Sequence, residues 1–146
     1  MKNILLFVWL LTVASCSNDG QIGPAEIRYG QDMCAGCSMI ISEKQYSAQY
    51  ILSDGSIKKF DDIGCMIEHI KKTKDEPGKV SATFVRDYKT NNWINVNNAH
   101  FFKSDKISTP MGHGIISFSS EEDLKEAQSK TGGTNLGKFD EAVKYF

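Results

Sequence analysis

The sequence has no excess of basic residues. Its 146 residues include 17 Lys and Arg against 18 Asp and Glu, which gives a formal net charge of −1. Proteins that bind nucleic acid usually carry a basic patch or stripe, and no such field is present here. The composition therefore argues against nucleic acid as a partner.

The sequence also lacks the motifs of common enzyme classes. It has no phosphate-binding glycine loop, no Ser/His/Asp arrangement and no pair of carboxylates at an acid–base spacing. Asp61 and Asp62 are neighbours at the start of an expected helix, where aspartate commonly caps the chain. We therefore predict a binding protein rather than an enzyme.

No apolar run is long enough to cross a membrane. The run ILLFVWLL, from Ile4 to Leu11, falls well short of the about 20 residues that a spanning helix needs. Lys2 precedes it and small residues follow it, as in a secretory signal peptide. Cys16 comes directly after these small residues, and the segment resembles a bacterial lipobox. This resemblance implies a lipoprotein signal peptide at residues 1–15 and acylation of Cys16.

The rest of the chain divides into a tether and a domain. Residues 16–25 are polar and contain Gly and Pro, which predicts a lipidated flexible tether. Residues 26–146 are enough for one domain of two small halves. Cleavage would remove Lys2 and leave 16 basic against 18 acidic residues, a net charge of −2. Lipid, not a polybasic segment, would then hold the protein to the membrane.

Hydrophobic periodicity predicts an α+β fold. Two segments share the same order of features. Each has a strand ending in Phe (Phe60 and Phe118), then two capping residues, a helix, a break and an extended segment. We therefore expect two ββαβ-like halves, about 26–90 and 91–146, with helices packed on antiparallel sheet. Apolar residues alternate with Ser47 and Gln49 in the expected strand 46–52, and a turn at 53–56 makes 57–60 the return strand of a hairpin. The other expected strands are 80–86, 93–102 with breaks, and 115–118, and the expected helices are 63–70, 124–130 and 140–146. Ser119 and Glu122 have capping-box spacing.

The cysteine count points to metal or redox chemistry. With Cys16 lipidated, three cysteines remain: Cys34, Cys37 and Cys65. An odd number cannot form a complete disulfide framework, so at least one thiol stays free or binds something. A free thiol in an oxidising compartment is a liability unless it is used or protected.

Cys34 and Cys37 form a CxxC pair that is followed by Met39. If the chain is extended from Cys37, residues 37, 39 and 41 share a face, and Cys37 and Met39 present two sulfur atoms together. Thiolate and thioether ligands favour Cu(I), whereas zinc rarely takes methionine. A thioredoxin-like dithiol would open a helix. This pair instead precedes a strand-like run, so we rank metal binding above a structural disulfide and both above an oxidoreductase.

Two further places offer metal ligands. Met111 and His113 are flanked by glycines just before a buried strand, which suits a loop that approaches an ion. Cys65 lies about 160° around its helix from Ile63, and so off the apolar stripe, with His69 one turn further on the same flank. It is expected to be partly activated in the first helical turn. It could reach the metal loop, pair with Cys34 or be a small surface residue. His69 and His100 are expected to be structural or solvated.

Together these features resemble the NosL family, the accessory lipoproteins of nitrous oxide reductase assembly. The resemblance covers almost the whole mature chain, and the order of the motifs is more specific than any one of them. The matching stretches are the lipobox at Cys16, Asp32–Met39, Phe60-Asp61-Asp62, Trp93-Ile94-Asn95, Ala99-His100-Phe101, Met111–Gly114 and Gly132-Gly133.

The resemblance implies a lipid-anchored, periplasmic chaperone that binds copper(I). It implies two ββαβ-like halves and delivery of copper to a copper enzyme, nitrous oxide reductase, or to its membrane assembly factors. The family's loop pattern Cys-Gly-Met falls on Cys37-Ser38-Met39, with serine for glycine, and its late Met-Gly element falls on Met111-Gly112. The implied ligands are Cys37, Met39 and Met111, followed by His113. Cys34 and Cys65 go beyond the minimal pattern and leave the exact ligand set open.

Three other functions remain open from the sequence. A periplasmic thiol–disulfide protein would use Cys34 and Cys37. A zinc-stabilised binding module would use the three cysteines and one histidine. A lipoprotein without metal would serve only as a scaffold.

Overall fold

The computed structural model describes residues 22–73 and 79–146. The signal peptide expected at residues 1–15, Cys16 and most of the expected tether lie outside the described residues. The described chain forms two antiparallel sheets and three α-helices, so the predicted α+β class is confirmed. None of the helices in this part of the chain has the length and apolarity needed to cross a membrane.

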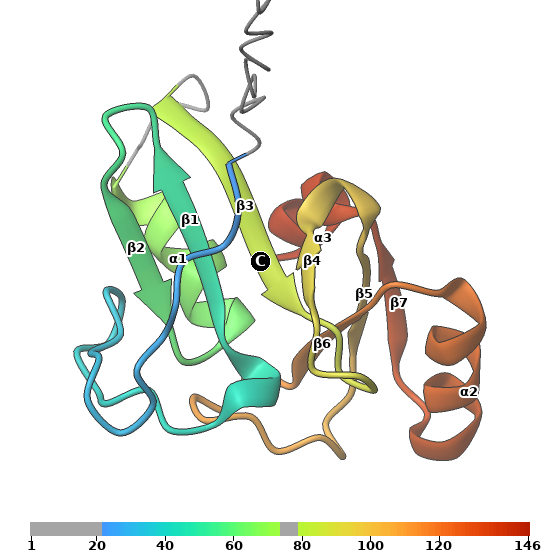
Figure 1. The fold of residues 1–146 in the computed structure, drawn as a ribbon. Coiled ribbons are helices and arrows are strands. Elements are labelled where there is room, and N and C mark those ends of the chain that lie inside the picture. The colour runs from blue at the N-terminus through green and yellow to red at the C-terminus, as the bar shows by residue number, and fades with distance from the viewer. Residues whose placement is uncertain (1–21, 74–78) are drawn as a thin grey trace, which may run out of the picture.

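The two sheets lie side by side, each with a helix packed against it (Figure 1). Helix α1 (Ile63–Thr73) covers the first sheet and also contacts β6 (Ile115–Phe118), while α2 (Glu121–Thr131) lies against the second sheet at the far side of the molecule. The elements in chain order are η1 (Lys44–Tyr46), β1 (Ala48–Leu52), β2 (Ile57–Phe60), α1 (Ile63–Thr73), β3 (Val80–Arg86), β4 (Trp93–Asn95), η3 (Val96–Asn98), β5 (His100–Lys103), β6 (Ile115–Phe118), α2 (Glu121–Thr131), β7 (Thr134–Gly137) and α3 (Phe139–Tyr145).

The first sheet has the strand order β2-β1-β3-β4. The predicted hairpin of β1 and β2 is present, with Gly55 in the left-handed conformation that its turn requires. Ser47 and Gln49, the polar residues of the alternating pattern, are fully buried instead of facing solvent. The amino-terminal segment covers this face, because Gln49 exchanges two hydrogen bonds with the backbone of Ala25 at 2.9 and 3.0 Å. Both faces of β1 are therefore protected.

The second sheet repeats the first. Its order, β6-β5-β7 with α2 between β6 and β7, matches β2-β1-β3 with α1 between β2 and β3. The order of features that the two segments of the sequence share thus corresponds to a repeated ββαβ unit. Strand β4 pairs with β3, with Arg86 opposite Trp93, and so belongs to the first sheet. The change from one sheet to the other therefore falls after Asn95, a few residues beyond the expected boundary at residue 90.

Each main helix begins at a polar cap. Asp62 accepts the N–H of Gly64 through its Oδ1 at 2.7 Å, which confirms an aspartate cap for α1. The cap of α2 is Ser120, whose Oγ accepts the N–H groups of Glu122 and Asp123. The helix cap therefore lies one residue after Ser119, the position expected from the capping-box spacing of Ser119 and Glu122.

A buried carboxylate joins the two halves. Asp87 follows β3 and is fully buried. Its Oδ1 accepts the N–H groups of Lys89 and Thr90 at 2.9 and 2.8 Å. Its Oδ2 accepts the N–H and hydroxyl of Ser119, just after β6, at 2.7 and 2.6 Å. Burial alone would raise the pKa of Asp87, but the donors from Ser119 and Thr90 outweigh it and lower the pKa below its usual value.

Replacement of Asp87 should loosen the joint between the halves. Asp87→Ala leaves several donors without their charged acceptor, so it should lower the free energy of unfolding at pH 7 by about 2–4 kcal/mol in urea denaturation. The exposed Asp105, changed to Ala, should cost less than about 0.5 kcal/mol.

The effect should also depend on pH. Because the pKa of Asp87 is lower in the folded state, its stabilisation is complete above the unfolded-state pKa of about 3.9 and is lost as the pH falls toward the folded-state value. The wild-type and Asp87→Ala proteins should therefore converge in stability at strongly acidic pH. Equal stability at pH 7 would contradict the role of Asp87.

Candidate metal centre

The first part of the centre is a tight hairpin that carries two of the cysteines. The N–H of Cys34 donates to the carbonyl of Met39 at 2.8 Å, and the N–H of Ser38 donates to that of Cys34 at 2.9 Å. Ser38 has φ of 63°, in the left-handed region that non-glycine residues rarely adopt. The turn directs the Cys34 side chain inward, where it is 2% exposed, and leaves Cys37 half-buried.

The hairpin is fastened to β2 and α1. The Asp32 carboxylate binds Lys59 on β2 at 2.6 Å, and this ion pair holds the pKa of Asp32 well below its usual range. The N–H of Ala35 donates to the carbonyl of Lys59 at 2.8 Å. Gly36 lies so close to α1 that a Cβ there would be 3.2 Å from the carbonyl oxygen of Cys65. Glycine therefore allows the close approach of the hairpin to the helix.

The second part is the start of α1. Cys65 lies in its first turn and is 5% exposed. The cap residue Asp62 also reaches the other half of the molecule, because its Oδ2 accepts the N–H of Met111 at 3.2 Å. One buried side chain thus sets both the start of the helix and the position of the Met111 loop.

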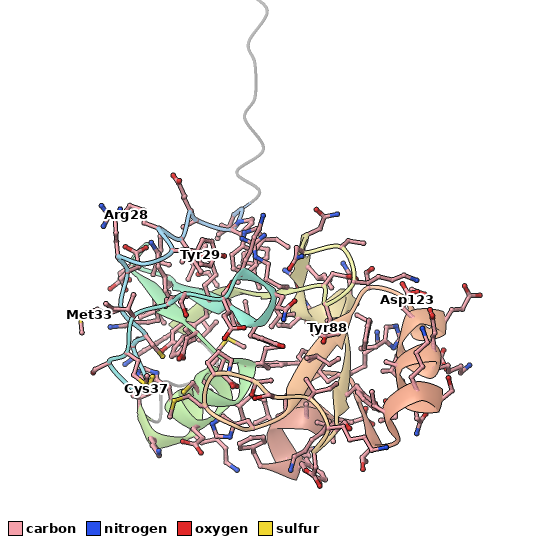
Figure 2. All side chains as sticks on the ribbon, turned by 90° about the horizontal axis from the view of Figure 1, so that it is seen from below. Arg28, Tyr29, Met33, Cys37, Tyr88 and Asp123 are labelled. Atoms are coloured by element: carbon pink, nitrogen blue, oxygen red, sulfur yellow. The ribbon has the colours of Figure 1, made fainter. Side chains whose placement is uncertain are left out.

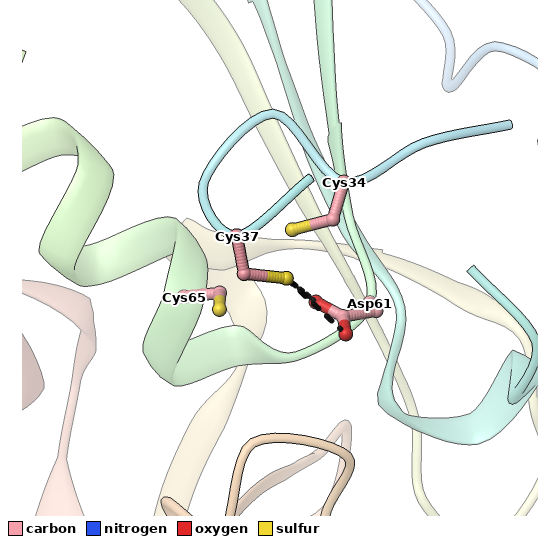
Figure 3. A group of neighbouring side chains, drawn as sticks. All are labelled: Cys34, Cys37, Asp61 and Cys65. Atoms are coloured by element: carbon pink, nitrogen blue, oxygen red, sulfur yellow. Dashed lines mark hydrogen bonds between the residues drawn. The ribbon is translucent and has the colours of Figure 1, made fainter. Parts of the chain in front are cut away.

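Three thiols and a carboxylate meet between these parts. The ligand atoms of Cys34, Cys37, Asp61 and Cys65 all lie within 4.8 Å of one another, and the three cysteines are free. Figure 3 shows the side chains converging from the hairpin, the end of β2 and the first turn of α1, with the Cys37 thiol directed at the Asp61 carboxylate at 3.6 and 3.7 Å. We refer to these four residues as the thiol cluster. Figure 2 shows Cys37 at the opposite end of the domain from Asp123 in α2.

The groups of the thiol cluster oppose one another's ionisation. The thiol of Cys65 donates a hydrogen bond that lowers the pKa of Cys34, and the same contact raises the pKa of Cys65. Burial raises the pKa of Cys37 to about 11. Burial, and then the neighbouring Cys34, raise the pKa of Asp61 to about 6. One thiolate is therefore favoured, and binding of a cation to the others would release protons.

A cavity of about 290 Å³ opens beside the thiol cluster. The Met111 side chain at its edge is 39% exposed. The His113 ring stacks edge-on against Phe146 with centroids 5.2 Å apart, and it lies over Gly64, where a Cβ would overlap it. The lining residues are Gly36, Cys37, Cys65, Glu68, His69, Lys72, Met111 and His113.

The structure brings five of the six predicted ligands to one place. Cys34, Cys37 and Cys65 are in the thiol cluster, and Met111 and His113 line the adjoining cavity. Met111 and Cys37 come from loops far apart in the sequence, and both line one cavity. Met39, the sixth, is not among the residues that line the cavity.

Met39 does not share a face with Cys37 in the expected way. The left-handed conformation of Ser38 interrupts the extended chain. Met39 is 55% exposed and is not among the residues that line the cavity, whereas Ile41 is fully buried. Its backbone N–H favours the Cys37 thiolate, so Met39 does contact the site through its main chain. Whether its thioether also binds a metal stays a prediction.

Two residues of the thiol cluster differ from the sequence-based interpretation. Cys65 is in the core and not off the apolar stripe, because the Cys34 hairpin covers that flank of α1. Its pKa is raised rather than lowered, because of the neighbouring Cys34 and of burial. Asp61 was interpreted only as a possible cap. Since Asp62 caps the helix, Asp61 is not needed as a cap, and the presence of two adjacent aspartates is the sequence signal for another role.

The remaining histidines have protein partners. The Nδ1 of His69 lies 3.1 Å from the Tyr50 hydroxyl, and its ring packs on Phe60. The Nε2 of His100 lies 3.3 Å from the Nζ of Lys138. These contacts agree with the structural roles expected for both.

Comparison with known proteins identifies relatives of the whole described domain. Residues 24–144 match the sequence model of the NosL family. The crystal structure of the copper chaperone NosL from Shewanella denitrificans has the same fold, with a TM-score of 0.70 and 21% identity. The match covers 80% of this chain and 93% of that chain. No curated protein matches the chain. The family resemblance seen in the sequence is thus confirmed.

The raised pKa of Asp61 predicts that its carboxylate lowers the free energy of unfolding of the metal-free protein at neutral pH. The carboxyl is protonated in both folded and unfolded states below its unfolded-state pKa of about 3.9, and it is ionised in both above about 6. The folded state therefore loses stability as the pH rises between these values. Asp61→Asn should make metal-free protein more stable by about 1–3 kcal/mol at pH 7, with the difference vanishing near pH 4.

Urea denaturation of the reduced, metal-free proteins between pH 4 and pH 7 measures this difference. Asp105→Asn, at an exposed position, is the matched control and should follow the wild type throughout. A loss of stability in Asp61→Asn at pH 7 would show that its carboxylate is not under strain from its neighbours.

Proposed function

The chain belongs to the NosL family, and on this premise we propose that it is a copper(I) chaperone, a carrier that holds the ion and passes it on without catalysing a reaction. The observation that carries the proposal is the thiol cluster, whose ligand atoms lie within 4.8 Å of one another and adjoin a cavity lined by Met111 and His113. The related NosL from Shewanella denitrificans is described as a copper chaperone, which supports the proposal.

The donor chemistry fits a soft monovalent ion. Thiolate and thioether ligands select Cu(I) over harder ions. The solvent exposure of the donors also increases from the buried thiol of Cys34 to the half-exposed thioether of Met111. An incoming ligand from a partner can therefore approach from the Met111 side while the ion is still held by thiolates. Ligand exchange of this kind needs an accessible coordination position and no chemical step.

The anchor and the recipient are parts of the same proposal. Acylation of Cys16 would hold the domain at the periplasmic side of the cell membrane. Anchoring raises the effective concentration of the carrier near membrane-bound partners. The proposed recipient is a copper enzyme, nitrous oxide reductase, or the membrane factors that assemble it. Support for the recipient comes from the family resemblance of the sequence.

A zinc site is the second candidate, and Asp61 is the observation that favours it. Three cysteines with one carboxylate can complete a four-coordinate tetrahedral zinc site, with Asp61 in place of the histidine expected from the sequence. The open cavity with Met111 and His113 has no role in such a closed site. Metal competition distinguishes the two: stoichiometric zinc that copper(I) cannot displace from the reduced protein would favour the zinc module.

Removal of cluster ligands should weaken copper(I) binding. Cys37→Ser should lower the Cu(I) affinity by more than the about 10–100-fold that residues outside the coordination sphere typically cost. The measurement is anaerobic competition with a chromophoric Cu(I) chelator. Unchanged affinity after replacement of both Cys37 and Met111 would reject this ligand set.

Two methionines on the same hairpin provide the controls. Met33→Leu alters an exposed thioether that does not line the cavity, and it should leave the affinity unchanged. Met39→Leu tests the ligand implied by the family pattern. A loss of affinity as large as that of Cys37→Ser would show that the Met39 side chain turns toward the ion on binding.

A further inference from the structure

The site offers more donors than one copper(I) ion can use. The thiol cluster supplies three sulfur atoms and a carboxylate, and the adjoining cavity adds the Met111 thioether and the His113 imidazole. Four of these donors already complete the coordination sphere of a tetrahedral ion. A single ion placed among the buried donors would leave Met111 and His113 unused, and an ion at the cavity would leave Cys34 and Asp61 unused.

The donors divide into two sets that share two thiols. Cys34 and Asp61 are each 2% exposed and belong only to the buried set. Met111 and His113 belong only to the cavity. Cys37 and Cys65 are members of the thiol cluster and also line the cavity, so they lie between the two sets. A thiolate sulfur has several lone pairs and can bind two soft cations at once.

We propose that this centre holds two copper(I) ions, an inner ion on the thiol cluster and an outer ion in the cavity, bridged by the thiolates of Cys37 and Cys65. The inner ion is held by Cys34 and Asp61 as well, and the outer ion by Met111 and His113. This inference rests on the proposed function, since it gives the stoichiometry of the same copper site.

The charges of the site support two monovalent ions. Once metal binding has released the protons of all three thiols, the thiol cluster carries four negative charges, and two Cu(I) ions reduce this to two. Buried charges without compensation are costly. The other charged residues lining the cavity, Glu68 and Lys72, pair with each other at 2.9 Å and supply no net positive charge. A second cation therefore compensates the charge that arises when the two bridging thiols ionise.

The arrangement separates storage from transfer. The outer ion lies beside the half-exposed Met111 and is the one that a partner's ligands can reach. The inner ion keeps the bridging thiolates ionised and in position while the outer ion leaves. The carrier could thus release one ion and retain the geometry needed to take up the next.

The test is the copper(I) stoichiometry of the reduced full domain. Anaerobic titration with native mass spectrometry should show two copper ions per chain, and X-ray absorption of the loaded protein should show a short copper–copper path. The double variant Met111→Leu, His113→Gln should bind one copper ion per chain. Met33→Leu, the matched exposed thioether, should retain two. Gly64→Ala, whose added Cβ would displace His113 without altering a donor, should also bind one ion.

The outcomes separate this inference from the proposed function. One tightly bound copper ion in the wild type, with no copper–copper path, would overturn the two-ion centre and leave the chaperone in place. No copper binding at all would overturn both. Retention of two ions in both the Met111/His113 double variant and Gly64→Ala would place the second ion elsewhere and overturn the outer site.

Discussion

The geometry of the metal centre depends on the carboxylate of Asp62, which is not itself one of the clustered donors. One of its oxygens caps α1 and so fixes the first turn of the helix, which carries Cys65. The other accepts a hydrogen bond from the backbone N–H of Met111 in the opposite half. Donors from two distant loops converge reliably when both loops are hydrogen-bonded to the same rigid side chain. A fully buried side chain with both oxygens satisfied is such a point.

The thiol cluster is an arrangement that a stable fold would avoid without a ligand. Four acidic groups are crowded into a largely buried space, where each one makes the ionisation of the next more difficult. Cys65 lies in the first turn of α1, where the helix dipole favours a negative charge. Stability is therefore given up locally for the sake of binding, as is common at functional sites. The rest of the core, which continues from α1 into the second sheet, supplies the rigidity that keeps the cluster assembled.

Sequence reasoning succeeded where local pattern decides structure. The hairpin, the three helices and the repeat followed from periodicity and capping residues, because each of these depends on neighbours in the chain. It failed where a distant segment determines the environment. Ser47 and Gln49 are expected to be exposed from the alternating pattern, but the amino-terminal segment covers them. Cys65 is expected off the apolar stripe of its helix, but the hairpin that carries Cys34 and Cys37 packs on that flank. The left-handed Ser38 falls where the family pattern has glycine, a clue to the turn that periodicity could not use.

The repeat of the two halves has a consequence for how this protein can change over evolution. Phe60 and Phe118 each end an outer strand, and Asp62 and Ser120 then cap the following helices. The residue between strand and cap is Asp61 in one copy, which joins the thiols, and Ser119 in the other, which holds Asp87. Equivalent positions have thus specialised, one in ligand chemistry and the other in cohesion. Substitutions that adapt the first unit to another ion can accumulate without touching the contact that keeps the two halves together.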